Sequence, residues 1–104
     1  MKISLLNFFE RRRYFKKQYS EMYDAVSWLY RSFCNISMTY VVNEDNIEQF
    51  NQVKNGIVKY AKELCKSLKL LDNEISWNGE ISRRTKKKRE KARKKIQEIL
   101  KLFG

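Results

Sequence analysis

The stretch FKKQYSEMYDAVSWLYRSF, residues 15–33, decides the fold. Its apolar residues recur at steps of four and three, a spacing that places them on one face of an α-helix. They are Phe15, Tyr19, Met22, Val26, Leu29 and Phe33. Apolar residues upstream extend the helix back to Ser4, whose short polar side chain suits an N-cap. We predict a first helix of roughly 30 residues, with any kink near the arginine triplet at 11–13.

A second helix is predicted after residues 35–46, NISMTYVVNEDN. The asparagines and β-branched residues of this stretch interrupt the first stripe, and it is the one segment suited to a short strand. Asn43 or Asp45 can cap the next helix, with Glu48 three residues beyond Asp45 as in a capping box. Apolar residues at helical spacing then run on to Leu71. They are Ile47, Phe50, Ile57, Ala61, Leu64, Leu68 and Leu71.

A third helix follows the turn signals of DNEISWNGE, residues 72–80. Ser82 can cap this helix, which we expect to end near Phe103. Its apolar residues, Ala92, Ile96, Ile99 and Phe103, lie only in its second half. Trp77 within the turn either closes the end of the core or anchors a partner.

The whole chain favours an all-α fold in one domain, residues 1–104. Proline is absent and only three glycines occur, so the residues that most often end helices are scarce. We predict a three-helix antiparallel bundle, with 42% hydrophobic residues to fill its core. The expected core residues are Phe15, Tyr19, Met22, Val26, Leu29, Phe33, Ile57, Leu64, Leu68, Ile96 and Ile99. A chain this short buries only about two thirds of its unfolded surface. Surplus aromatics on the stripes, and two helices longer than a small solitary bundle needs, make a homo-oligomer or docking on a larger assembly credible.

Several classes of function are disfavoured by what the sequence lacks. There is no histidine, and Cys34 and Cys65 do not have the spacing of a zinc or redox site. We expect two reduced, half-buried thiols, no metal and no cofactor. The carboxylates are scattered, so no enzyme is predicted. The apolar stretch near the N-terminus is too short for a signal peptide or a membrane span, which favours a cytoplasmic protein.

The most informative functional feature is RRTKKKREKARKK, residues 83–95, within a chain of net charge +11. A domain this basic is expected to attract polyanions. The cations of this run are Arg83, Arg84, Lys86, Lys87, Lys88, Arg89, Lys91, Arg93, Lys94 and Lys95. A second cluster consists of Arg11, Arg12, Arg13, Lys16 and Lys17. We predict that these residues bind the phosphate backbone of RNA or DNA.

The two clusters form one surface if the third helix returns beside the first. The start of the third helix then lies near the start of the first, and the two helices run parallel. We expect the first half of the third helix to lack a packing face and to fray until an anion neutralises it. Tyr14 and Phe15 lie within the first cluster, where an aromatic ring could stack on an unpaired base.

Other readings stay open at this stage. The chain could be a protein-interaction subunit or inhibitor that docks through Trp77 and Tyr14. It could lie on anionic lipid through KISLLNFFERRRYFKK, residues 2–17, which we favour least. The basic run alone could be a solvated helix or a nuclear-localisation signal. We favour a nucleic-acid-binding accessory subunit of a nucleoprotein assembly, without base-specific readout, because no known recognition motif occurs.

Overall fold

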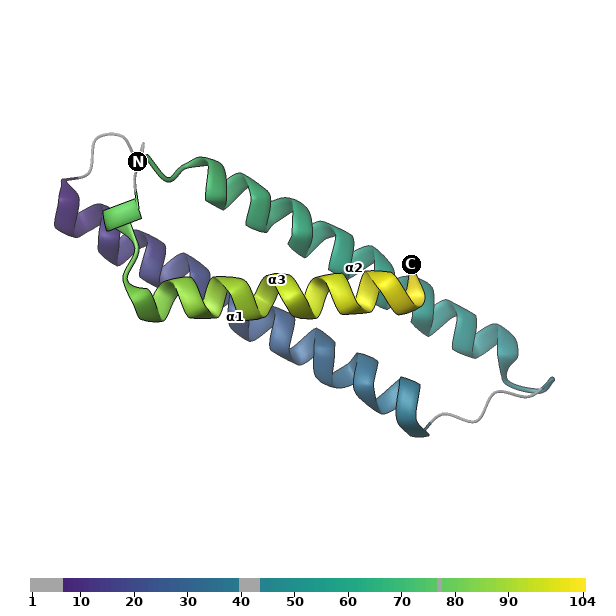
Figure 1. Ribbon diagram of the computed structural model, residues 1–104. Coiled ribbons are helices and arrows are strands. Elements are labelled where there is room, and N and C mark those ends of the chain that lie inside the picture. Colours follow the sequence, from purple (N-terminus) through teal and green to yellow (C-terminus); the bar gives the residue numbers. More distant parts are fainter. Residues whose placement is uncertain (1–6, 40–43, 77) are drawn as a thin grey trace.

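The computed structural model describes residues 7–39, 44–76 and 78–104, and within them the chain forms three α-helices and one short 3₁₀ turn. The helices are α1 (Phe8–Thr39), α2 (Ile47–Asn73) and α3 (Arg83–Phe103), and the turn is η2 (Asn78–Glu80). Figure 1 shows that α1 and α3 begin at the same end and run parallel, whereas α2 runs antiparallel to both. The predicted three-helix bundle is confirmed.

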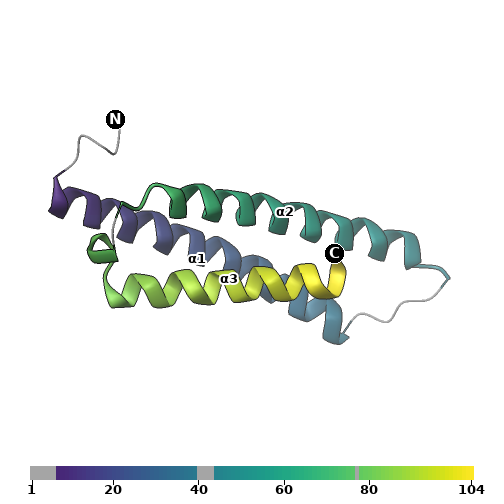
Figure 2. The same cartoon turned by 45° about the horizontal axis from the view of Figure 1, so that its top comes forward.

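The bundle is elongated, measuring 57 × 23 × 17 Å. α1 has 32 residues and α3 has 21, so α3 covers only part of the hairpin formed by α1 and α2. In the turned view of Figure 2, α3 runs beside α1 and stops short of the start of α2. The charged first half of α3 lies against the first half of α1, where Lys88 Nζ donates to Ser20 Oγ.

The apolar stripes read from the sequence form the core. Ten of the eleven expected core residues are buried: Phe15, Tyr19, Val26, Leu29, Phe33, Ile57, Leu64, Leu68, Ile96 and Ile99. Met22 is half-buried and packs against this core. Where α3 ends, the Phe103 ring lies 4.8 Å from the Phe33 ring and 6.4 Å from the Phe50 ring, centroid to centroid. One aromatic cluster thus joins all three helices there.

Asp72 joins the three helices a second time, through polar contacts. Its Oδ1 accepts a hydrogen bond of 2.6 Å from the hydroxyl of Tyr19 on α1. From α3, Arg89 Nε lies 3.0 Å from Oδ1, and Arg93 Nη2 donates to Oδ2 at 3.0 Å. Burial raises the pKa of the Tyr19 phenol, and the hydrogen bond to Asp72 raises it further, so the hydroxyl stays a donor.

The ends of α1 and α2 differ from the sequence predictions. α1 begins at Phe8, where Asn7 Oδ1 accepts from the Glu10 amide at 2.9 Å, whereas Ser4 lies outside the described residues. α1 also continues through residues 35–39, and the described part of 35–46, the one segment suited to a short strand, contains no strand. Ile36 packs against the core there, and such packing outweighs weak helix propensity. α2 has Asn46 at its N-cap position, not Asn43 or Asp45.

Candidate nucleic-acid interface

The start of α3 is capped and packed against the bundle. Ser82 Oγ accepts a hydrogen bond from the Thr85 amide at 3.2 Å, which confirms the predicted cap. Thr85 is only 4% exposed, so the expectation that this half of α3 has no packing face is wrong. The reason is helical phase: Thr85 precedes the buried Ala92 by seven residues, and both lie on the inward face.

Arg11, predicted as a phosphate contact, forms a clamp within the fold. Its Nε donates to Glu80 Oε1 at 2.8 Å and its Nη2 donates to Glu80 Oε2 at 3.1 Å. Nη2 also donates to the Glu74 carbonyl at 3.1 Å and to Ser76 Oγ at 3.2 Å. The clamp ties the connection between α2 and α3 to α1, and thereby sets where α3 begins.

Glu80 is the buried partner in this clamp, with 2% of its surface exposed. The hydrogen bond from Arg11 holds the pKa of the Glu80 carboxyl below its usual value, although burial opposes the shift. The same hydrogen bond raises the pKa of Arg11. Glu80 was not predicted from the sequence, because its partner lies 69 positions away and no local spacing signals the pair.

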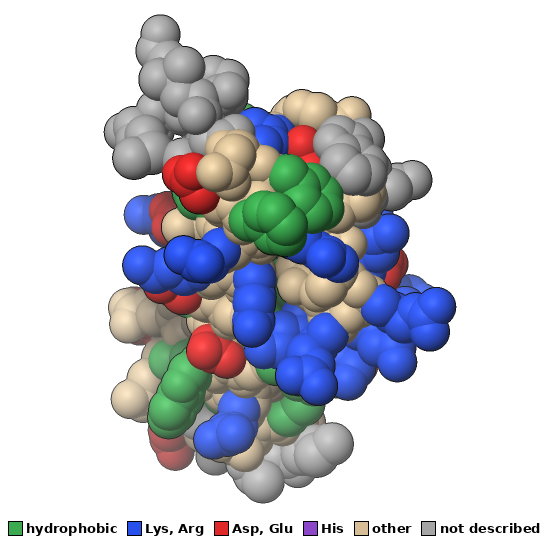
Figure 3. Space-filling model, turned by 90° about the vertical axis from the view of Figure 1, so that its left-hand side faces the viewer, with side chains coloured by type: hydrophobic (Ala, Val, Ile, Leu, Met, Phe, Trp, Pro, Cys, Tyr) green, Lys and Arg blue, Asp and Glu red, His purple; other side chains and the backbone are tan. Residues whose placement is uncertain are grey.

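A groove between the first half of α1 and the start of α3 gathers cations from both predicted clusters. We call it the basic groove. α1 lines it with Phe9, Arg12, Arg13, Lys16 and Ser20, and the α3 side lines it with Ser82, Arg84, Thr85 and Lys88. In the end-on view of Figure 3, Lys and Arg side chains crowd this end of the molecule, with a hydrophobic patch among them.

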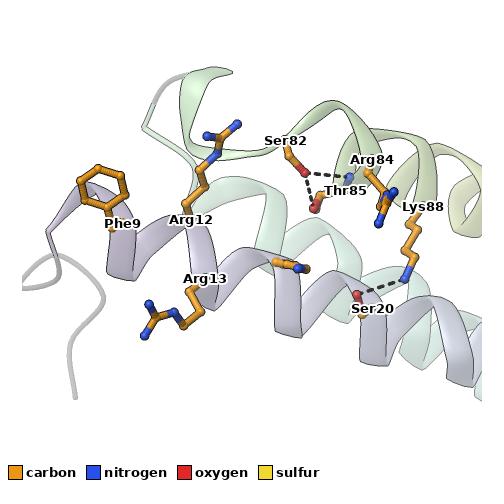
Figure 4. Close-up of a pocket in the computed structure, with 9 residues that line it drawn as sticks. Phe9, Arg12, Arg13, Ser20, Ser82, Arg84, Thr85 and Lys88 are labelled. Atoms are coloured by element: carbon orange, nitrogen blue, oxygen red, sulfur yellow. Dashed lines mark hydrogen bonds between the residues drawn. The ribbon is translucent and has the colours of Figure 1, made fainter.

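The two walls of the groove face each other in Figure 4. Arg12 and Arg13 extend from α1, and Arg84 and Lys88 extend from α3. Lys88 reaches across the groove, and its Nζ donates to Ser20 Oγ on α1 at 3.3 Å. Cations from both helices therefore line one groove, which the parallel packing of α1 and α3 creates, although Arg12 and Arg13 extend to opposite sides of α1 in this view.

All charged side chains among the described residues that line the basic groove are positive. Five of its nine described lining residues are Lys or Arg, and none is acidic. Its volume of about 470 Å³ is in the usual range for ligand sites, and it differs from most of them in the number of cationic side chains that line it. The N-terminus of α3 adds the positive end of a helix dipole. A ligand with several negative charges fits this lining best.

The other predicted contact residues lie around the groove or turn away from it. Lys17, Arg83, Lys87, Lys91 and Lys94 are exposed beyond its lining, and Lys86 is half-buried. Arg89 and Arg93 are held by Asp72. The Lys95 ammonium lies over the rings of Tyr23 and Tyr30, at 5.1 and 5.4 Å from their centroids.

The predicted aromatic contacts need revision. Phe15 is fully buried, as expected of a core residue, so its ring is not available to stack on a base. Tyr14 is half-buried, and its hydroxyl donates to Glu74 Oε2 at 3.2 Å. Trp77 lies outside the described residues. The aromatic side chain that lines the groove is Phe9, which was not among the residues predicted to contact nucleic acid.

Comparisons with known proteins leave the site to be interpreted from its own chemistry. No protein-family model, curated protein or solved structure shows significant similarity to the chain.

Cys34 and Cys65 are free and half-buried. Within the described ranges, no three potential metal ligands gather. No helix in the described part of the chain combines the length and apolar character needed to cross a bilayer.

Proposed function

We propose that the protein binds nucleic acid through phosphates held in the basic groove, as a non-enzymatic accessory component of a nucleoprotein assembly. The observation that carries the proposal is that one groove is lined by Arg12, Arg13 and Lys16 from α1 and by Arg84 and Lys88 from α3. Phosphodiesters present regularly spaced negative charges, and arginine forks match their geometry. A backbone ligand therefore uses all the cations that the groove assembles.

The cations at the start of α3 lower the stability of the fold, and this supports a functional role for them. Arg83, Arg84 and Lys86 lie in the first turn of α3, which contains no acidic residue. Cations at a helix N-terminus oppose the helix dipole by about 0.3–1 kcal/mol each at an exposed site. Crowded like charges add repulsion of a few tenths of a kcal/mol per helical pair. Features that oppose local stability in this way are typical of functional sites.

Recognition of the backbone, without base readout, follows from the same lining. Apart from Phe9, the groove presents charge and hydroxyl groups, and the sequence has no motif that inserts side chains against base edges. Binding should therefore depend strongly on salt. Four phosphate contacts on a single strand give a log-log salt slope near −3, so affinity falls roughly 50-fold when salt rises fourfold.

The test is fluorescence anisotropy with labelled RNA and DNA oligomers at 50 and 200 mM salt. The groove variant carries Arg12→Gln, Arg13→Gln, Lys16→Gln and Arg84→Gln. We expect it to bind weakly at low salt and to lose most of the salt dependence, with a slope reduced by about 3. All four side chains are exposed, so the fold should survive, which circular dichroism can verify.

A matched control removes the same number of charges elsewhere. Lys59, Lys62, Lys66 and Lys69 are exposed on α2 and do not line the basic groove. Changing all four to glutamine should weaken binding far less than the groove variant. Equal loss in both variants would mean that net charge alone attracts the oligomer. Absence of binding by the wild type at low salt would refute the proposal and favour salt-insensitive docking on a protein.

A further inference from the structure

The basic groove has one exposed aromatic ring at its edge. Phe9 is 73% exposed and lines the groove, although a phenylalanine side chain gains stability from burial. Its ring meets the Phe8 ring in a T-shaped contact, with centroids 5.3 Å apart. Figure 4 shows Phe9 at the start of α1, on the approach to Arg12. An apolar ring held in water beside a cationic groove suggests a ligand with both flat and charged parts.

The other aromatic rings nearby are already used by the fold. Phe15 is fully buried, and Tyr14 packs edge-on against it at 5.4 Å. The Tyr23 ring lies under two ammonium groups, those of Lys88 at 5.9 Å and Lys95 at 5.1 Å. Among the described residues that line the groove, Phe9 is the only aromatic one. A stacking partner at this site would therefore meet Phe9.

Phe9 is also in register with the cations of α1. Arg12 and Arg13 follow it by three and four residues and Lys16 by seven, spacings that share one face of a helix. One helical turn rises about 5.4 Å, so a group on the ring lies within reach of the first two guanidinium groups. A base on Phe9 would place its adjoining phosphates over these cations.

We propose that Phe9 is a stacking platform for an unpaired base and that the ligand of the groove is single-stranded nucleic acid. The inference rests on the proposed function and narrows it. Bases inside a duplex already stack on their neighbours, so only an unpaired base can lie on an added ring. Phosphates in the groove and one base on Phe9 together select a single strand over a duplex.

A lipid surface is the competing ligand for an exposed phenylalanine beside cations. A helix that lies in a bilayer interface needs an apolar face that continues along its length. On α1 the positions one turn after Phe9 are Arg12 and Arg13, so the apolar face stops there. The ring instead borders a concave cationic lining. These observations favour the single strand and leave lipid as an outcome to test.

The experiment compares three ligands of equal length: a single-stranded oligomer, the same strand with abasic sites, and a duplex. Anisotropy titrations use the wild type, Phe9→Ala and Phe9→Trp. Phe9→Ala should weaken binding to the intact single strand about tenfold, because it removes one base–aromatic stack. Binding to the abasic strand and to the duplex should change less than twofold. Phe9→Trp, unlike Phe9→Ala, should keep the wild-type preference for the intact strand over the abasic strand and the duplex.

Trp28→Ala is the matched control, since Trp28 is 69% exposed on α1 but does not line the groove. It should leave all three affinities unchanged. Equal effects of Phe9→Ala on the three ligands, or no effect, would overturn the inference while the groove variant still tests the phosphate site. Binding to phosphatidylserine vesicles that requires Phe9, with oligomer binding unaltered, would also overturn it. Loss of groove-dependent binding altogether would refute the proposed function instead.

Discussion

Arg11 and Arg12 are neighbours in the sequence and have opposite roles in the structure. The Arg11 guanidinium is clamped to the buried Glu80, whereas Arg12 is exposed and lines the basic groove. α3 repeats the contrast, with Arg93 held by Asp72 and Arg84 facing the groove. One residue step turns a side chain by about 100° around a helix, which is enough to separate the two roles. Residue type and local charge density therefore do not distinguish a structural cation from a binding cation.

Among these contacts, the ion pair between Arg11 and Glu80 should contribute most to the free energy of unfolding. Glu80→Ala leaves Arg11 as a cation that is only 12% exposed and has lost its carboxylate. Breaking such a buried pair costs about 3 kcal/mol of unfolding free energy. Urea denaturation followed by circular dichroism measures the loss. Glu63→Ala, at an exposed position of α2, is the control and should cost less than about 0.5 kcal/mol.

Acid provides an independent check on the same pair. The pKa of Glu80 is lowered in the folded state, so its stabilising contribution is present above the unfolded-state pKa of about 4.3. The contribution is lost as pH falls through the lower folded-state pKa. The stability difference between wild type and Glu80→Gln should therefore shrink as the pH falls below about 4. A difference that stays constant from pH 7 to pH 3 would contradict the clamp.

Asp72 should contribute the next largest effect. Asp72→Asn keeps an acceptor for the Tyr19 hydroxyl but removes the negative charge that faces Arg89 and Arg93. We expect a loss of about 2 kcal/mol, less than at Glu80, because these arginines are 25% and 36% exposed and water partly replaces the carboxylate. The measurement is the urea midpoint at constant m-value. If Asp72→Asn leaves the stability unchanged, Arg89 and Arg93 do not stabilise the fold and belong to the binding cations.

The comparison also shows what the sequence could reveal. The stripes from Phe15 to Phe33 and from Ile57 to Leu71 predict helices and their inward faces, because a helical period is a local property. The meeting of the two basic clusters also follows from element order, once α3 is placed parallel to α1. The partners of Arg11 and Arg93 do not follow, because they join residues far apart in the chain. Phe15 lies on the apolar stripe and was expected in the core, whereas Phe9 lies off the stripe, and only the packing of α3 beside α1 shows that Phe9 lines a groove.

Arg84→Gln should have the smallest effect on the free energy of unfolding, and the effect should be stabilising. Comparing it with Arg93→Gln distinguishes a binding cation from a structural one. Arg84→Gln removes a positive charge from the first turn of α3, so the unfavourable dipole and repulsion terms both decrease. Stability should rise by a few tenths of a kcal/mol while the salt slope for nucleic acid falls by about one. Arg93→Gln makes the same charge change on the same helix but removes a contact to Asp72, so its stability should fall. If both variants shift the urea midpoint in the same direction, charge at the start of α3 opposes folding no more than charge elsewhere, and the cations of the groove are not maintained at the expense of stability.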